Sequence, residues 1–101
     1  MKRRPHELDV SDALGDLVEA LRSLRDAGEL RAFLEDLCTP AELEAMADRW
    51  RVVPLIEAGV PYREIHDRTL VSVTTIGRVA RTLERGAGGY AAALRHRRSA
   101  D

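Results

Sequence analysis

The sequence predicts an all-helical protein, and three observations lead to this class. Aromatic residues are scarce, apolar residues recur with helical spacing, and helix start and stop signals follow one another along the chain. Of the 101 residues, 45% are apolar, yet only one Trp, two Tyr and one Phe are present. Leu, Ala, Val, Arg and Glu, which are frequent instead, together favour a helical core over a sheet. We expect no strand.

The first two expected helices carry leucine-rich stripes. Residues 1–10 are charged and contain Pro5, so we expect a flexible N-terminus. From Ser11, apolar residues follow the i, i+3, i+4, i+7 spacing of an amphipathic helix; they are Leu14, Leu17, Val18, Leu21 and Leu24. Gly28 interrupts this pattern. A second helix then places four apolar residues on one face; they are Leu30, Phe33, Leu34 and Leu37.

The third expected helix begins at "TPAE", with Thr39 as N-cap, Pro40 at the first helical position and Glu42 completing a capping box. Its expected buried residues are Leu43, Met46, Ala47, Trp50 and Val53. Pro54 removes a backbone hydrogen bond, so we expect a kink or an early end there. Gly59 marks the stop.

A helix-turn-helix is predicted at about residues 61–85. Its first helix runs from about Pro61 to Thr69, with Tyr62 and Ile65 turned inward. Ser72 caps the next helix, whose expected inner face consists of Val73, Ile76, Val79, Ala80 and Leu83. "RGAGGY" ends it, and "YAAALRHRR" is a terminal helix or a basic tail. The sequence thus indicates one helical domain at 11–94 and a basic tail at 95–101.

Charge is divided unevenly, although the formal net charge is only −1. Residues 1–60 hold 8 Lys and Arg against 13 Asp and Glu, whereas residues 61–101 hold 8 Arg against 4 acidic residues. Small domains also divide their charge unevenly by chance. The functional interpretation is that residues 61–101 face a polyanion.

The residue types of the predicted helix-turn-helix suit DNA reading. In such a motif the second helix lies in the major groove, and short exposed residues let its backbone approach the bases. Ser72, Thr74, Thr75 and Gly77 meet this demand. Arginines available for phosphates are Arg63, Arg68, Arg78, Arg81 and Arg85, and His66 lies on the exposed side of the first helix.

Two segments, "FLEDLCTPAELEAMADRWRVV" and "YREIHDRTLVSVTTIGRVARTLERGAGGY", resemble the Trp-repressor superfamily, and within it the short YerC/YecD-type proteins. The resemblance is ungapped from Phe33 to Tyr90. It implies a Trp-repressor-like, intertwined homodimer that represses transcription at a palindromic operator. By position, it implies a DNA-facing set of Arg63, His66, Ser72, Val73, Thr74 and Gly77, with Arg78 near the backbone. Three departures are Leu70 at a usual turn glycine, Pro61 at a usual Ser or Thr cap, and Pro54.

The resemblance also raises the question of a tryptophan effector. Tryptophan-responsive members hold the amino acid between two arginines, beside a threonine and a glycine. Thr39, Arg49 and Arg78 occupy three of these positions, but Val79 stands at the glycine position. A valine there would overfill the space of the indole ring, and such overpacking costs about 1–3 kcal/mol. We therefore do not expect tryptophan to bind; an unknown effector or none is expected, and no cofactor.

The sequence gives little support to other functional classes. His6, His66, His96 and the lone Cys38 show no catalytic or metal-ligand spacing, so neither an enzyme nor a metal site is expected. No apolar run reaches the ~18 residues of a membrane helix, and a cytoplasmic location is the default. Two alternatives stay open: a self-contained monomer instead of a homodimer, and a helical adaptor that binds an acidic partner of the transcription machinery instead of DNA.

Overall fold

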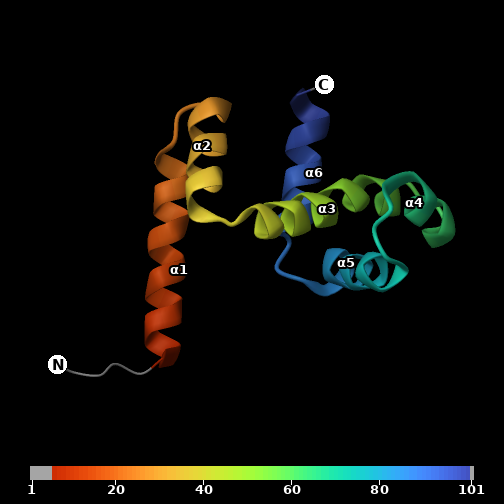
Figure 1. The fold of residues 1–101 in the computed structure, drawn as a ribbon, viewed down its shortest axis with the longest axis horizontal. Helices are drawn as coiled ribbons and strands as arrows, with labels where there is room; N and C mark the ends of the chain where they lie inside the picture. Colours follow the sequence, from red (N-terminus) through yellow and green to blue (C-terminus); the bar gives the residue numbers. More distant parts are fainter. Residues whose placement is uncertain (1–5, 101) are drawn as a thin grey trace. The chain divides into compact units, whose positions relative to one another are not determined.

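A computed structural model describes residues 6–100 of the chain, and side chains from Asp12 to Arg98. This part of the chain contains helices and no strand, which confirms the all-α prediction. The helices are α1 (His6–Ser23), α2 (Ala27–Leu37), α3 (Pro40–Glu57), α4 (Tyr62–Thr69), α5 (Val73–Arg85) and α6 (Gly89–Ala100) (Figure 1). Half of the expected flexible N-terminus, residues 1–5, lies outside the described residues; α1 begins at His6.

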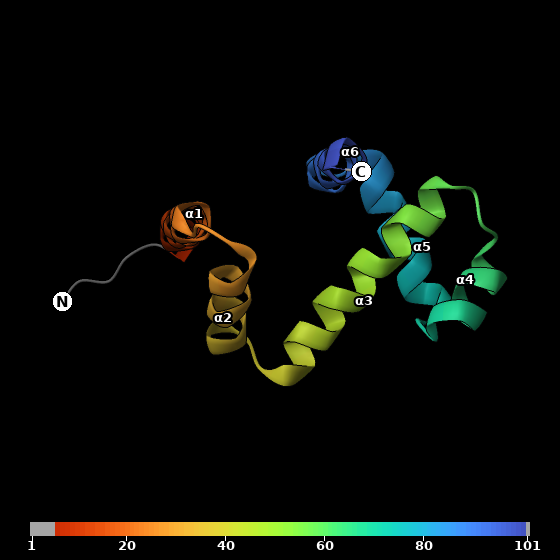
Figure 2. The same cartoon turned by 90° about the horizontal axis from the view of Figure 1, so that it is seen from above.

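The chain divides into two compact units, Met1–Pro40 and Ala41–Asp101. The first contains α1 and α2, which lie side by side in both views (Figures 1 and 2). The second contains α3 to α6. The single helical domain expected at residues 11–94 stays a prediction. None of the described helices is long and apolar enough to cross a membrane.

Helix α2 begins at a cap that the sequence analysis missed. The Asp26 carboxylate accepts a hydrogen bond from the Glu29 backbone N–H at 2.9 Å, while the Glu29 side chain accepts from the Arg25 N–H at 2.8 Å. The first bond satisfies one of the orphan N–H groups of the helix start, and the second ties the Glu29 side chain to the residue before the cap. Gly28, expected to interrupt the helices, lies inside the first turn of α2. The missed signal is Asp-x-x-Glu, a capping pattern as strong as the one at Thr39.

The described side chains of the first unit lack a core. None of the residues from Asp12 to Pro40 is buried, and three of the predicted stripe residues are largely exposed: Leu14 at 58%, Val18 at 48% and Leu37 at 51%. Leu17, Leu21, Phe33 and Leu34 are half-buried. The helical spacing was right, but an amphipathic face is buried only where another element covers it.

Helix α3 passes Pro54 and continues to Glu57, so the early end considered above is not observed. A proline inside a helix costs about 3 kcal/mol. Full burial of the preceding Val52 and Val53 offsets this cost, since burying one such side chain contributes about 1.5–3 kcal/mol. After Glu57, Gly59 adopts a φ of +81°, and a Schellman turn is formed by two N–H bonds, from Gly59 to the Ile56 carbonyl at 3.0 Å and from Val60 to the Leu55 carbonyl at 3.1 Å.

The core lies in the second unit. Its buried side chains come from α3, α4, the turn after α4, α5 and α6, and they are Val52, Val53, Ile65, Val71, Ile76, Val79 and Leu94. Predicted burial was correct for Val53, Ile65, Ile76 and Val79. It was wrong for Met46 at 40% exposed, Tyr62 at 42% and Val73 at 51%, and Ala47 is also exposed. Val53 and Met46 both belong to α3, but Val53 lies near the C-terminal end of this helix. Residues of α4, α5 and α6 cover that end.

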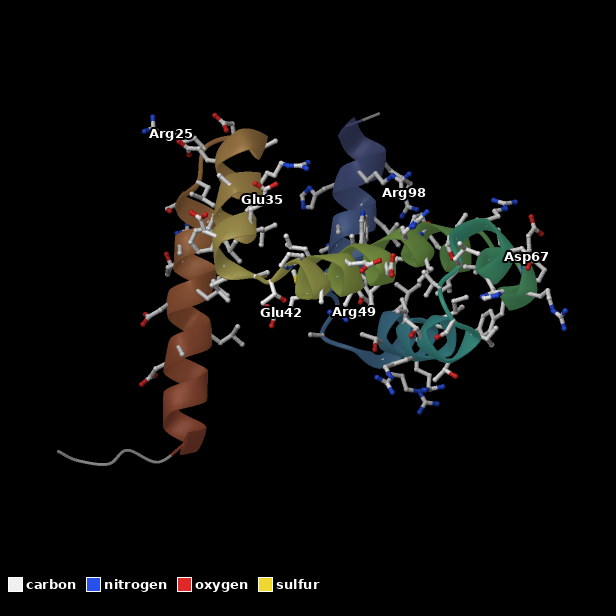
Figure 3. The ribbon with its side chains drawn as sticks, viewed as in Figure 1. Arg25, Glu35, Glu42, Arg49, Asp67 and Arg98 are labelled. Atoms are coloured by element: carbon white, nitrogen blue, oxygen red, sulfur yellow. The ribbon has the colours of Figure 1, made fainter. Side chains whose placement is uncertain are left out.

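Besides the buried Leu94, two contacts with α3 join helix α6 to this unit. The rings of Trp50 and Tyr90 lie 6.5 Å apart, and an Arg98 Nη1 donates to a Glu57 carboxylate oxygen at 2.7 Å. Figure 3 shows Arg98 projecting from α6. The segment expected as a basic tail thus includes residues 95–100 of a helix; residue 101 lies outside the described part.

Candidate nucleic-acid interface

The predicted helix-turn-helix is present as α4, a three-residue turn and α5, packed against each other (Figure 1). Pro61 stands at the N-cap of α4 with extended backbone, φ −61° and ψ 147°, and supplies no side-chain hydrogen bond. The helix is anchored instead by Ile65, which is completely buried. Pro61 therefore replaces the expected Ser or Thr cap without displacing the helix.

The turn keeps a left-handed residue despite the absence of glycine. Leu70 has a φ of +65° and its side chain is 81% exposed. A left-handed conformation costs a residue with a Cβ about 1–2 kcal/mol. Local hydrogen bonds offset this strain: the Leu70 N–H donates to the His66 carbonyl at 2.7 Å, and the His66 ring bonds to the Val71 carbonyl at 2.8 Å. The Thr69 hydroxyl adds a third link by accepting from the Val71 N–H at 3.1 Å.

Ser72 caps α5 as predicted. Its hydroxyl oxygen accepts from the Thr75 backbone N–H at 3.1 Å and donates to the Thr75 hydroxyl at 3.0 Å. A serine hydroxyl has one hydrogen and two lone pairs, so Ser72 retains a single acceptor site for any other partner. The Thr74 hydroxyl, by contrast, has no hydrogen-bond partner within the described residues. Of these two candidate readers, Thr74 is the freer.

The two faces of α5 differ in character. Ile76 and Val79 point into the core, at 0% and 1% exposure. The predicted DNA-facing residues of α5 are exposed or half-buried: Ser72, Val73, Thr74, Arg78, Arg81 and Arg85 are exposed, and Gly77 is half-buried. On α4, Arg63 is exposed and His66 is half-buried. The whole predicted set is therefore available to a partner on the outside of one hairpin.

Positive charge on this hairpin is mostly uncompensated. Within the described residues Arg63, Arg78, Arg81 and Arg85 have no ion-pair partner, whereas Arg68 pairs with Glu64 one turn away. Side chains ending in nitrogen project from α5 on the side away from α3 (Figure 3). Exposed ion pairs contribute little to stability, so four free guanidinium groups do little for the fold. They supply the charge that a phosphate backbone requires.

Tyr62 belongs to this surface, which the sequence analysis missed by placing it in the core. A Cβ built on Gly77 would lie 4.0 Å from Cε2 of the Tyr62 ring and 3.8 Å from Arg81 Nη1. Tyr62, Gly77 and Arg81 are thus neighbours. Tyr62 shares its helix face with Ile65, but it stands in the first turn of α4, beyond the core. The small Gly77 leaves room beside the ring.

The residues suggested as an effector pocket do not form one group in a single unit. Thr39 belongs to the first unit, and Arg49, Arg78 and Val79 to the second. Arg49 on α3 (Figure 3) and Arg78 on α5 are exposed, whereas Val79 is part of the core beneath α5. A valine thus stands in the core at the position where the resemblance implies a glycine in tryptophan-responsive members.

Comparisons with known proteins agree with this geometry. The family model described as Trp repressor protein matches residues 12–98. A protein of Bacillus subtilis (strain 168), named uncharacterized protein YerC, is 37% identical over 93 residues, which cover 92% of this chain and 84% of that protein. No solved structure matches the chain.

Proposed function

The chain belongs to the Trp repressor family, and from this premise we propose that it is a sequence-specific repressor of transcription that binds double-stranded DNA as a homodimer. One observation carries the proposal: short exposed side chains at the start of α5 stand beside four arginines that have no ion-pair partner among the described residues. Short side chains let the backbone of α5 come close to the bases in the major groove. Guanidinium groups displace the counterions of the DNA phosphates. A palindromic operator is the natural target of a two-fold symmetric protein.

The homodimer is supported by the uncovered apolar face of α1 and α2. Leu14, Val18 and Leu37 are about half exposed, and no described residue of the first unit is buried. A monomeric chain gains little from ordering such helices, because most helical stability in proteins comes from packing an apolar face. A second copy of the chain presents the same face and so supplies the cover.

The contacts expected with DNA fall into two groups. Thr74, Val73 and Gly77 face base edges, because they lie on the first turns of α5. Arg63, Arg78, Arg81 and Arg85 reach phosphates, and they fix the position of the hairpin without reading sequence. Free tryptophan is not the effector in this proposal, because the resemblance puts Val79 at a glycine position and a valine there is expected to fill the space of the indole.

The test is a titration of Thr74→Ala and Arg81→Ala against a palindromic duplex selected from a random pool and a scrambled duplex, at several salt concentrations. Thr74→Ala is expected to weaken the selected duplex by about 1–3 kcal/mol and to change the preferred sequences. Arg81→Ala is expected to weaken both duplexes equally and to lower the salt slope by about one.

Two matched variants serve as controls. Thr82→Ala makes the same chemical change in the last turns of α5 and should leave sequence preference unchanged. Arg51→Ala removes an arginine that faces Asp48 at 3.8 Å and should leave the salt slope unchanged. If the wild-type protein binds no duplex in a salt-dependent manner, or if Thr74→Ala keeps the order of preferred sequences, α5 is not the reader. The helical adaptor with an acidic protein partner then becomes the better hypothesis.

A further inference from the structure

The imidazole ring of His66 is held across the turn of the hairpin. Its Nδ1 lies 2.8 Å from the Val71 carbonyl oxygen, and the residue is half-buried. A carbonyl oxygen only accepts hydrogen bonds, so Nδ1 must carry the hydrogen. In the neutral ring the second nitrogen, Nε2, then has a bare lone pair and no hydrogen.

Among the described groups of the turn, none competes with the Val71 carbonyl for a hydrogen bond to the imidazole ring. The other turn groups already have partners: the Leu70 N–H donates to the His66 carbonyl at 2.7 Å, and the Thr69 hydroxyl donates to the Ile65 carbonyl at 2.7 Å. The Val71 N–H donates to the Thr69 oxygen at 3.1 Å. Only the Val71 carbonyl faces the imidazole as an acceptor, which fixes both the orientation of the ring and its tautomer.

The Nε2 atom of His66 is open to an external partner. Among the described residues, only Nδ1 of this ring has a hydrogen-bond partner. No polar side-chain atom in that part of the chain is both buried and unpartnered, so Nε2 reaches solvent. Its ring is tied to Val71, the residue that precedes the Ser72 cap of α5. The free lone pair therefore lies at the end of α5 that is proposed to meet the bases.

From this geometry we infer that His66 determines sequence specificity by accepting a hydrogen bond, through Nε2, from the exocyclic amino group of cytosine or adenine. These amino groups are the hydrogen-bond donors that bases present in the major groove. Phosphate oxygens are acceptors, so a bare lone pair gains nothing from them. The inference rests on the proposed DNA-binding function, and it gives His66 a role different from that of the flanking arginines.

The first test needs no DNA. Nitrogen-15 spectra of the imidazole at about pH 8.5, where imidazoles are ordinarily neutral, should show hydrogen on Nδ1 and none on Nε2 of His66. Asn at position 66 also carries an N–H group one bond from Cγ, so His66→Asn should keep the bond to Val71 and the thermal midpoint. His66→Ala should lower that midpoint. A spectrum with the hydrogen on Nε2 would overturn the inference.

The second test compares duplexes selected from a random pool by the wild type, His66→Asn and His66→Gln. His66→Asn lacks an atom at the Nε2 position, so preference for adenine or cytosine should disappear at one position per half-site, with a roughly tenfold loss of affinity. His66→Gln extends an amide to that distance and should select adenine there, because Gln bonds adenine in a bidentate manner.

Other outcomes separate this inference from the proposed function. If His66→Asn weakens all duplexes equally, or if the complex shows a hydrogen on Nε2, the ring contacts phosphate and the inference is wrong while DNA binding stands. If the wild type selects no duplex, the proposed function fails together with this base contact. The spectrum of the free protein then still decides whether the tautomer is fixed.

Discussion

The two units of the chain use similar helices in opposite ways. Residues 12–40 contain a leucine-rich pair of helices in which no described residue is buried. Residues 41–98 contain seven buried apolar residues drawn from four helices and one turn. The difference does not lie in apolar content, since both units carry amphipathic stripes. It lies in whether the chain itself provides a second surface: the second unit has a core of its own, whereas no described residue of the first unit is buried, and we expect the first unit to pack against a partner.

The largest expected change is a loss of stability caused by a cavity in the core of the second unit. Ile76→Ala should lower the free energy of unfolding by about 2–5 kcal/mol, because Ile76 is completely buried and its neighbours can close the space only in part. Denaturant unfolding followed by circular dichroism measures the loss. Val73→Ala, at a half-exposed position of the same helix, is the control and should change stability by less than about 1 kcal/mol. Equal losses would mean that α5 is not anchored by this core.

The next effect concerns the first unit. The double variant Leu14→Asp with Val18→Asp should weaken self-association roughly a hundredfold or more, because two carboxylates would be buried without partners in the proposed dimer. Light scattering across a dilution series measures it. The exposed pair Glu19→Ala with Arg22→Ala, on the same helix, serves as control and should not alter association. A wild-type protein that is a folded monomer at micromolar concentration contradicts the homodimer.

A smaller effect is expected at the strained turn of the second unit. Leu70→Gly should raise the free energy of unfolding by about 0.5–1 kcal/mol, since relief of about 1–2 kcal/mol of left-handed strain exceeds the entropy cost of glycine. The leucine side chain is 81% exposed, so little packing is lost. Leu70→Ala retains a Cβ and should not stabilise the protein. Thermal unfolding compares the three proteins, and a destabilised glycine variant would show that Leu70 is covered in solution.

The smallest effect is expected for the ion pair between α6 and α3. Arg98 and Glu57 are 59% and 40% exposed, and water screens such pairs. A double-mutant cycle with Arg98→Ala and Glu57→Gln should give a coupling of no more than about 0.5 kcal/mol. The contact of the Trp50 and Tyr90 rings should then account for more of the α6 attachment. A coupling well above 1 kcal/mol would make the ion pair a principal link.

The sequence by itself determined that the chain is helical, roughly where α1 to α5 lie and where the hairpin is; it left open whether the last segment is a helix or a basic tail. The helix start at Pro40, the cap at Ser72, the glycine stop at Gly59 and the spacing of Ile65, Ile76 and Val79 are local signals, and local hydrogen bonding and periodicity encode them directly. The exposure of Thr74, Arg78 and Arg81 followed from the same periodicity, since a helix that buries Ile76 and Val79 must turn these three residues outward; the exposure of Val73 did not.

Only the tertiary structure decided how far each apolar face is covered. The helical spacing predicted that Met46, Tyr62 and Val73 are buried, yet all three are at least 40% exposed. Burial of an apolar helix face depends on which elements pack against it, and the spacing of its residues does not specify these elements. The same holds for the left-handed Leu70 and for the bond from His66 to the Val71 carbonyl. Both arise from the path of the chain between α4 and α5, which neither residue type specifies on its own.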